Sequence, residues 1–174
     1  RVSEALVGLG LCAVQLGELQ KAEGLLRDAE QTLRGAGGGL QLARVHAAFA
    51  EYAIAAGRTP EAARRLEEAG TIRLGIGAMT GVPWLLELWA CVAVERGEFE
   101  RAVRLLAASA KGRERLACHV RPSEVEFCER FEIRADEEVG SSDGDASGDR
   151  RGVLAEEGRG MPMRRALRYA RGDG

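Results

Sequence analysis

The sequence predicts an all-α fold, a right-handed solenoid of about three helical hairpins followed by C-terminal capping helices. Three observations lead to this prediction. Aromatic residues are only 5% of a chain that is 45% apolar, so the core must consist mainly of Leu, Ala and Val. Gly17, Gly57 and Gly97 recur at intervals of 40 residues. Apolar residues on both sides of each glycine follow helical spacing.

Three positions keep the same register in all three copies of the repeat. Each glycine fits the left-handed position that ends a helix, where a side chain would be strained. The alanine five residues later leaves room for a second helix to approach closely. The repeated positions are Gly17, Ala22 and Leu26, then Gly57, Ala62 and Leu66, and then Gly97, Ala102 and Leu106.

The elements follow from this register in chain order. We expect a helical-repeat domain over residues 1–139, and Thr59 followed by Pro60 predicts an N-cap and an N1 proline at the start of one helix. The expected hairpins span about 2–34, 40–73 and 83–112, and a capping helix spans about 122–138.

A change of composition follows the capping helix. The stretch GSSDGDASGD has no large apolar residue, so residues 140–150 are expected to form a disordered linker. Residues 151–174 are expected to form a basic C-terminal tail with a short helix.

The stretch GIGAMTG, residues 75–81, is the part of the chain that most resembles a phosphate-binding loop. A dinucleotide fingerprint needs a preceding strand, but the preceding segment has helical periodicity, and the third glycine is misplaced. Its first two glycines also have counterparts one period earlier, at Gly35 and Gly37. We therefore interpret the stretch as a connector between hairpins and predict no cofactor.

The sequence gives equally little evidence for a disulfide, a metal site or a catalytic residue. Four cysteines show no paired spacing and are expected to be reduced thiols, and Cys118, His119 and Cys128 lack the spacing that clamps a metal ion. His46 falls at an apolar position of its predicted helix, so we expect it to be packed. The sequence thus predicts no catalytic residue, no metal site and no enzyme.

Charge and hydropathy argue against two further classes, nucleic-acid-binding proteins and membrane-spanning proteins. The formal net charge of −2 gives no overall attraction to nucleic acid, and the basic tail has one aromatic residue and no helix-turn-helix pattern, so direct nucleic-acid contact is not expected. No apolar run approaches 18 residues, which predicts a cytoplasmic chain without a membrane span. Because Arg1 is not a methionine, we expect a segment of a longer protein.

A partner groove is the remaining candidate site. Trp84, just inside its predicted helix, could line the groove that stacked hairpins create, whereas Trp89 falls at a core position. Arg101 and Arg104 lie on one helix and are interpreted either as a solvated face or as a contact for an acidic partner.

The repeat resembles the tetratricopeptide family. The pattern falls on Leu9, Gly10, Gly17, Leu19, Ala22, Leu26 and Ala29 in the first copy, and on Trp89, Ala90, Gly97, Phe99, Ala102, Leu106 and Ser109 in the third. The interval of 40 residues exceeds the ~34 that is usual for that repeat, which implies longer helices or connectors.

A narrower resemblance covers most of the chain. Residues 81–116, 121–132 and 154–170 look like the C-terminal region of large bacterial signal-transduction ATPases, including LuxR-type activators and cyclase-fused relatives. Pro162 departs from the helix-capping Ser or Thr of that family. The resemblance implies a sensing segment beside a separate ATP-binding domain.

Two functions are therefore expected. The first is a non-catalytic protein-interaction and sensing segment of a larger ATP-dependent bacterial signalling or transcriptional regulator, with a protein or peptide, or the upstream ATPase domain, as partner. The second is a freestanding tetratricopeptide adaptor. The identity of the partner and the oligomeric state stay open at this stage.

Overall fold

The computed structural model describes residues 2–34, 39–118, 121–141 and 149–172, and in this part of the chain every regular element is an α-helix. The all-α prediction is confirmed for these residues. The helices are α1 (Val2–Gln15), α2 (Leu19–Arg34), α3 (Gly39–Ala55), α4 (Thr59–Ile76), α5 (Val82–Glu95), α6 (Phe99–Leu116), α7 (Pro122–Ser141), α8 (Arg150–Arg159) and α9 (Met163–Arg171).

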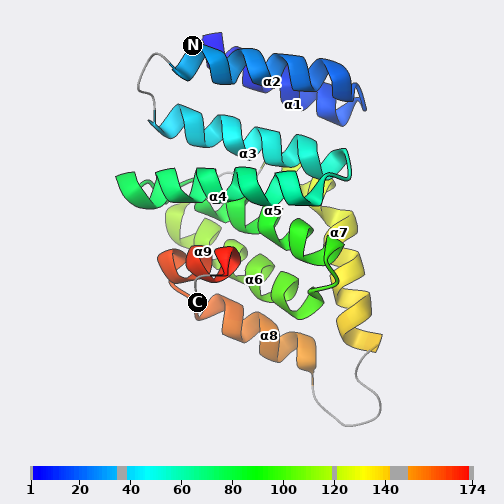
Figure 1. Ribbon diagram of the computed structural model, residues 1–174. Helices are drawn as coiled ribbons and strands as arrows, with labels where there is room; N and C mark the ends of the chain where they lie inside the picture. Colours follow the sequence, from blue (N-terminus) through cyan, green and yellow to red (C-terminus); the bar gives the residue numbers. More distant parts are fainter. Residues whose placement is uncertain (1, 35–38, 119–120, 142–148, 173–174) are drawn as a thin grey trace. The chain divides into compact units, whose positions relative to one another are not determined.

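The chain divides into two compact units, Arg1–Ala78 and Met79–Gly174. In the first unit, α1 pairs with α2 and α3 pairs with α4, each as an antiparallel hairpin, and α3 also packs against α1 and α2 (Figure 1). In the second unit, α5 and α6 form a third hairpin. Three helical hairpins are therefore present, as the sequence predicted.

The glycine at each hairpin turn has the left-handed backbone that the sequence predicted. The φ angles of Gly17, Gly57 and Gly97 are 73°, 70° and 75°. After α1, the Gly17 N–H donates to the Val14 carbonyl and the next N–H donates to the Ala13 carbonyl, and the other two turns repeat this pair of bonds. This is the Schellman arrangement, which satisfies the last carbonyls of a helix.

The start of α4 differs from the prediction. Thr59 is the first helical residue, and Arg58 takes the N-cap position without a side-chain hydrogen bond. The turn itself forces this shift, because the Arg58 N–H completes the turn after Gly57 and the Arg58 carbonyl already accepts from Ala62. Pro60 lies in the first turn, where its missing N–H costs nothing.

The small residues at the hairpin crossings are fully buried. Ala22, Ala62 and Ala102 have no exposed surface. A Cβ added to Gly10 would lie 2.9 Å from Leu26 Cδ2, so even alanine at this position would require the Leu26 side chain to shift. At these crossings the helices pack closely through small residues and not through large aromatic side chains.

The third copy departs from the first two at its large apolar position. Leu26 and Leu66 are fully buried, but Leu106 is partly exposed and Leu105 is fully buried instead. α6 packs against α7, α8 and α9 as well as α5, which fits the burial of a side chain outside the repeated positions.

The GIGAMTG stretch ends one helix and leads into the next. Its first two residues belong to α4, and Gly77 ends that helix with a φ of 71°. The next helix begins at Val82. The counterparts Gly35 and Gly37 lie outside the described residues.

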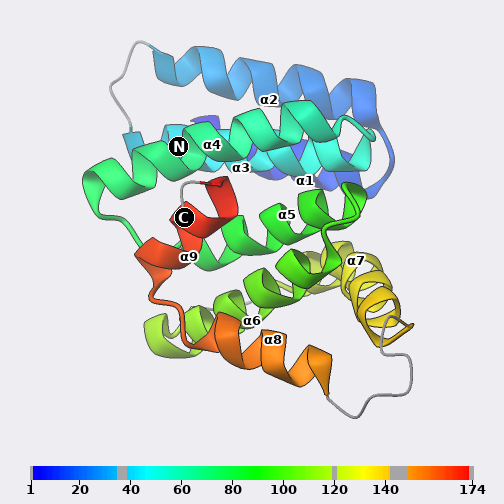
Figure 2. The ribbon, with the colours of Figure 1, turned by 60° about the horizontal axis from the view of Figure 1, so that its bottom comes forward.

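The expected basic tail, residues 151–174, contains two helices where one short helix was expected. α7 continues through Ser141 and α8 begins at Arg150 after Asp149, whose side chain accepts from the Gly152 N–H as N-cap. Both ends of the expected linker over 140–150 are therefore helical, and residues 142–148 lie outside the described residues. α8 lies along α6, and α9 lies against α5 and α6 (Figure 2). Leu154 and Leu167 are fully buried. Two helices therefore occupy the expected basic tail, because each contributes an apolar face.

Candidate functional site

An exposed apolar strip runs along α1 and into the turn after it. Its residues recur at intervals of three and four positions, which places them on one face of a helix. We call this strip the α1 seam, and it consists of Val2, Ala5, Leu9, Cys12 and Leu16. The larger members Val2, Leu9 and Leu16 are 66%, 57% and 73% exposed.

The α1 seam is not the face that holds α1 in its unit. Val7, Leu11 and Val14 are the buried side of the helix, packed within the first unit. A surface helix normally presents polar residues opposite its buried face. α1 instead carries apolar side chains on both sides, so one apolar face stays in contact with solvent.

A shallow depression lies between α1 and α3, on the side of α1 that is turned away from the α1 seam. It holds only about 10 Å³ and is lined by Ser3, Glu4, Val7, Gln41, Arg44 and Val45. The Arg44 guanidinium donates to Glu4 Oε1 across it at 2.9 Å, and both side chains are about half exposed. Small-molecule sites usually need ~300 Å³ or more. The depression has room for about one water molecule and is far too small for a metabolite.

The candidate groove residues Trp84, Arg101 and Arg104 do not converge on one site. Trp84 lies at the start of α5, where its ring packs edge-on against Phe127 of α7 at 6.4 Å between centroids. The two arginines lie on the first turns of α6, beside the α5–α6 turn. In an antiparallel hairpin these are opposite ends.

Arg101 holds the end of α9. Its guanidinium donates to the carbonyls of Tyr169 and Ala170 at 2.9 and 2.7 Å, and to Glu98 at 2.8 Å. The carbonyls of the last turn of a helix have no intrahelical partner, and a cation there also favours the helix dipole. This side chain therefore caps α9 from a neighbouring helix.

Arg104 joins α6 to α8. Its Nε donates to Glu157 at 2.6 Å, and its other end pairs with Glu100 at 3.5 Å. The side chain is only 19% exposed. Both arginines of the candidate groove are thus engaged inside the second unit.

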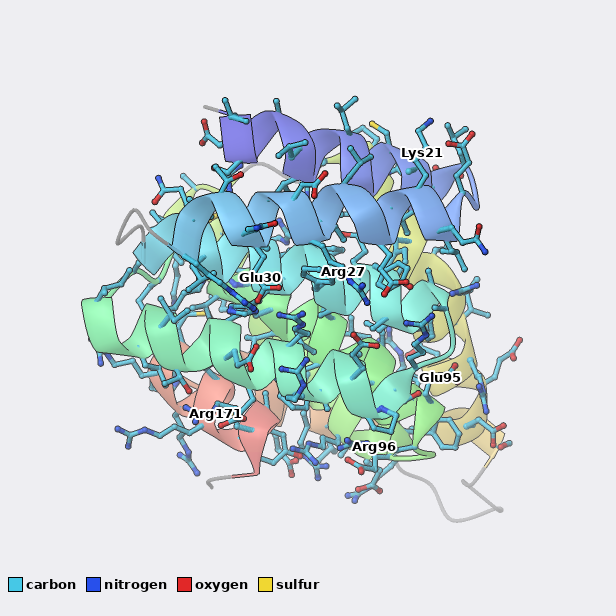
Figure 3. All side chains as sticks on the ribbon, turned by 45° about the horizontal axis from the view of Figure 1, so that its top comes forward. Lys21, Arg27, Glu30, Glu95, Arg96 and Arg171 are labelled. Carbon is cyan, nitrogen blue, oxygen red and sulfur yellow. The ribbon has the colours of Figure 1, made fainter. Side chains whose placement is uncertain are left out.

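A buried polar cluster joins three helices of the first unit. Glu30 of α2, labelled in Figure 3 on the side of its helix that turns toward α4, accepts two hydrogen bonds from Arg65 at 2.9 and 3.3 Å. The Arg65 guanidinium also lies 4.0 Å from the ring centre of Phe49. His46 of α3 is buried, as expected, but beside charged groups and not in apolar surroundings.

The imidazole of His46 stands between a cation and an anion. Its Nδ1 lies 3.0 Å from an Arg65 nitrogen and 3.0 Å from Glu68 Oε2. Neutral, Nδ1 can accept from Arg65; protonated, it can donate to Glu68. Burial lowers the pKa of His46, although the Glu68 charge opposes this shift, so the neutral form is favoured in the folded chain.

A second polar cluster fixes α7 to the α5–α6 hairpin. The Arg113 guanidinium donates to both Glu87 oxygens, at 2.7 and 2.6 Å, and to Glu124 at 3.2 Å. The Ser109 hydroxyl lies 2.6 Å from Glu87 and 2.9 Å from the Pro83 carbonyl. All these side chains come from the three packed helices, so the cluster joins α5, α6 and α7.

A comparison with models of known protein families, with curated proteins and with solved structures finds no match for this chain. Its function must be argued from its own residues.

The described residues contain no group of three or more His, Cys, Asp or Glu side chains that could hold a metal ion. Of the metal-ligand candidates, Cys118 donates to the Thr80 carbonyl at 3.2 Å, Cys128 is buried beside Cys91, and His119 lies outside the described part. Among the helices described, none is long and apolar enough to cross a membrane.

Sequence reasoning missed the α1 seam and both polar clusters. The seam could have been found, because its alternating spacing is visible in the sequence once α1 is placed. The clusters could not, since Arg65 is 35 residues from Glu30 and their pairing depends on how α2 meets α4.

Proposed function

We propose that this chain is a non-catalytic protein-interaction segment that binds an amphipathic helix of a protein partner along the α1 seam. The observation that carries the proposal is the exposure of Val2, Leu9 and Leu16 on one face of a helix that is already packed on its other side. An exposed apolar strip of this kind on a water-soluble domain commonly marks an interaction surface.

The spacing of the seam selects a helical partner. Alternating intervals of three and four residues match the a and d positions of a coiled coil, whose side chains insert between those of a facing helix. Burial of one leucine side chain contributes about 1.5–3 kcal/mol, so three large members supply enough for specific but reversible binding.

The proposed architecture is a right-handed, tetratricopeptide-like solenoid that includes all three hairpins. It is supported by the interval of 40 residues and by the common turn geometry of Gly17, Gly57 and Gly97. In such arrays each hairpin contacts only its neighbours, so an apolar face of one hairpin is normally covered by the next.

The proposed context is a cytoplasmic sensing segment of a larger ATP-dependent bacterial regulator, as the resemblance of residues 81–116 implies. A freestanding adaptor is the second candidate. The reading frame upstream of Arg1 separates them, because a Walker A motif there supports the regulator and its absence favours the adaptor. Tight binding of ATP to these 174 residues, measured by calorimetry, would contradict a non-catalytic assignment.

The docking proposal can be tested with a synthetic probe. The probe is a fluorescein-labelled helical peptide with leucine at its a and d positions, used below the concentration at which it self-associates, and binding is followed by anisotropy. We expect Leu9→Glu to weaken binding at least about tenfold, because it places a charge in the apolar contact.

The matched control is Val153→Glu, which changes an apolar residue of α8 that is 51% exposed and lies outside the seam. It should leave the affinity unchanged. Absence of binding to the parent chain, or equal loss in both variants, would show that the α1 seam is not the docking surface.

A further inference from the structure

The second unit holds two buried thiols in contact. The Sγ atoms of Cys91 in α5 and Cys128 in α7 lie 3.7 Å apart, and these residues are 0% and 6% exposed. The other two cysteines have different surroundings, since Cys12 is exposed on the α1 seam and Cys118 is hydrogen-bonded to a backbone carbonyl. The sequence spacing of 37 residues gave no sign of this pair.

Polar contacts fix the register of α5 and α7 on both sides of the thiols. One helical turn before them, Glu87 and Glu124 share the Arg113 guanidinium. Beyond them, Arg134 of α7 lies 3.6 Å from Glu95 of α5. The residue numbers of the contacting pairs increase along both helices, so α5 and α7 run in the same direction. These contacts fix the positions along the two helices at which Cys91 faces Cys128.

We propose that Cys91 and Cys128 are a redox-sensitive pair that a hydroperoxide converts to a disulfide, locking α7 onto α5. A disulfide has an S–S bond of about 2.05 Å, so the sulfurs must approach by about 1.7 Å, which side-chain rotation and a small helix shift can supply. This inference is independent of the α1 seam and of the proposed docking function.

The chemistry needs no group other than the two thiols and the oxidant. The Cys128 sulfur, which belongs to the more exposed residue of the two, attacks one oxygen of the hydroperoxide as a thiolate, forms a sulfenic acid and releases hydroxide or alkoxide. The Cys91 sulfur then attacks the sulfenic sulfur, the S–S bond forms, and the hydroxyl leaves as water with the proton of the Cys91 thiol. The two sulfurs together lose two electrons, which reduce the peroxide bond.

The bond would restrain the segment between the two cysteines, which contains all of α6. A cross-link stabilises mainly by reducing the conformational freedom of the unfolded chain, and the effect grows with the length of the closed loop. α7 would also lose the local opening that separates it from α5. Oxidation should therefore raise Tm and slow hydrogen exchange in α7.

The test uses the full chain with Cys12→Ser and Cys118→Ser, so that only the buried pair remains; serine keeps a donor for the Thr80 carbonyl. The protein is treated with hydrogen peroxide, unfolded, alkylated and examined by intact mass. We expect a monomer lighter by two hydrogens that accepts no alkyl group, a Tm higher by several degrees, and full reversal by dithiothreitol.

Single variants in the same background test the assignment. Cys91→Ser should leave a sulfenic acid at Cys128 that dimedone traps, and neither it nor Cys128→Ser should gain Tm on oxidation. In the wild-type chain, Cys12 reports that the oxidant acted. The proposal is wrong if Cys91 and Cys128 both stay alkylatable when Cys12 is oxidised, or if the only disulfide is between molecules.

Discussion

Each hairpin turn depends on one glycine whose surroundings are open but whose backbone is left-handed. No atom lies within 4 Å of a Cβ placed on Gly57, yet its φ is 70°. Gly57→Ala should therefore lower the free energy of unfolding by about 1–2 kcal/mol through backbone strain alone. Urea denaturation measures this.

The same substitution at Gly24 is the control, because Gly24 lies inside α2 with equally open surroundings and without positive φ. Gly24→Ala should raise stability by about 0.5–1 kcal/mol through helix propensity. If both variants shift in the same direction, the turn does not depend on a left-handed residue.

His46 should make stability depend on pH near neutrality. Its folded pKa lies below the ordinary 6.5, so on acidification the unfolded chain takes up the proton first. The free energy of unfolding should fall as the pH drops below about 6.5. Carboxylates with lowered pKa, such as Glu23, whose largest cause is a hydrogen bond from Tyr52, lose their contribution only below about 4.5.

The control for this prediction is His46→Gln, which keeps an acceptor for Arg65 but does not titrate. Urea unfolding at about pH 7.5 and about pH 5.5 should give a smaller loss on acidification for His46→Gln than for the parent. Equal losses in the two proteins would mean that His46 keeps an ordinary pKa in its cluster.

Individual residues show where sequence periodicity was sufficient and where it failed. It placed Gly17, Gly57 and Gly97 correctly because a left-handed turn is a local requirement. It could not indicate that Leu105 is fully buried, because α6 also packs against α7, α8 and α9, which lie outside the repeat.

At the scale of elements, the hairpins could be predicted and the packing of α8 and α9 could not. Helical period and turn chemistry act within about 20 residues, so α1 to α6 follow from the local sequence. α8 is held by contacts to α6 such as Arg104 with Glu157, 53 residues apart, and the arginine-rich composition of the region conceals its apolar face. The same limit applies to Arg101 and Arg104, whose contacts with α9 and α8 no local pattern indicates.

The packing of α8 against α6 depends on the absence of one side chain. A Cβ on Gly158 would collide with the carbonyl oxygen of Arg104 and lie 3.0 Å from Ala107 Cβ. Because a backbone oxygen cannot rotate away, Gly158→Ala should cost about 1–3 kcal/mol and loosen α8. Denaturation and hydrogen exchange over 150–159 measure the two effects.

Gly140→Ala in α7 is the matched control, since nothing lies within 4 Å of a Cβ there. It should leave stability unchanged or slightly higher, as helix propensity predicts. A neutral Gly158→Ala would mean that α8 does not approach α6 through its glycine.

For the whole molecule, the stability of one unit can depend on that of the other or be independent of it. Each unit has its own buried core, with Phe49 and Tyr52 in the first and Leu85 and Leu105 in the second. A stacked array, as proposed, gains stability from each hairpin and from each interface between neighbours. Damage to one hairpin should then weaken the next.

Ala62→Trp tests this coupling. Ala62 is fully buried at the α3–α4 crossing, so tryptophan there should overpack it and cost about 1–3 kcal/mol or more, whereas Ala110→Trp, at an exposed site of α6, should cost little. In a continuous solenoid the exchange protection of α5 should fall together with that of α3 and α4. If the loss ends at Ala78, the units are stabilised independently, and the proposed solenoid must be replaced by two separate helical domains joined at the α4–α5 connector.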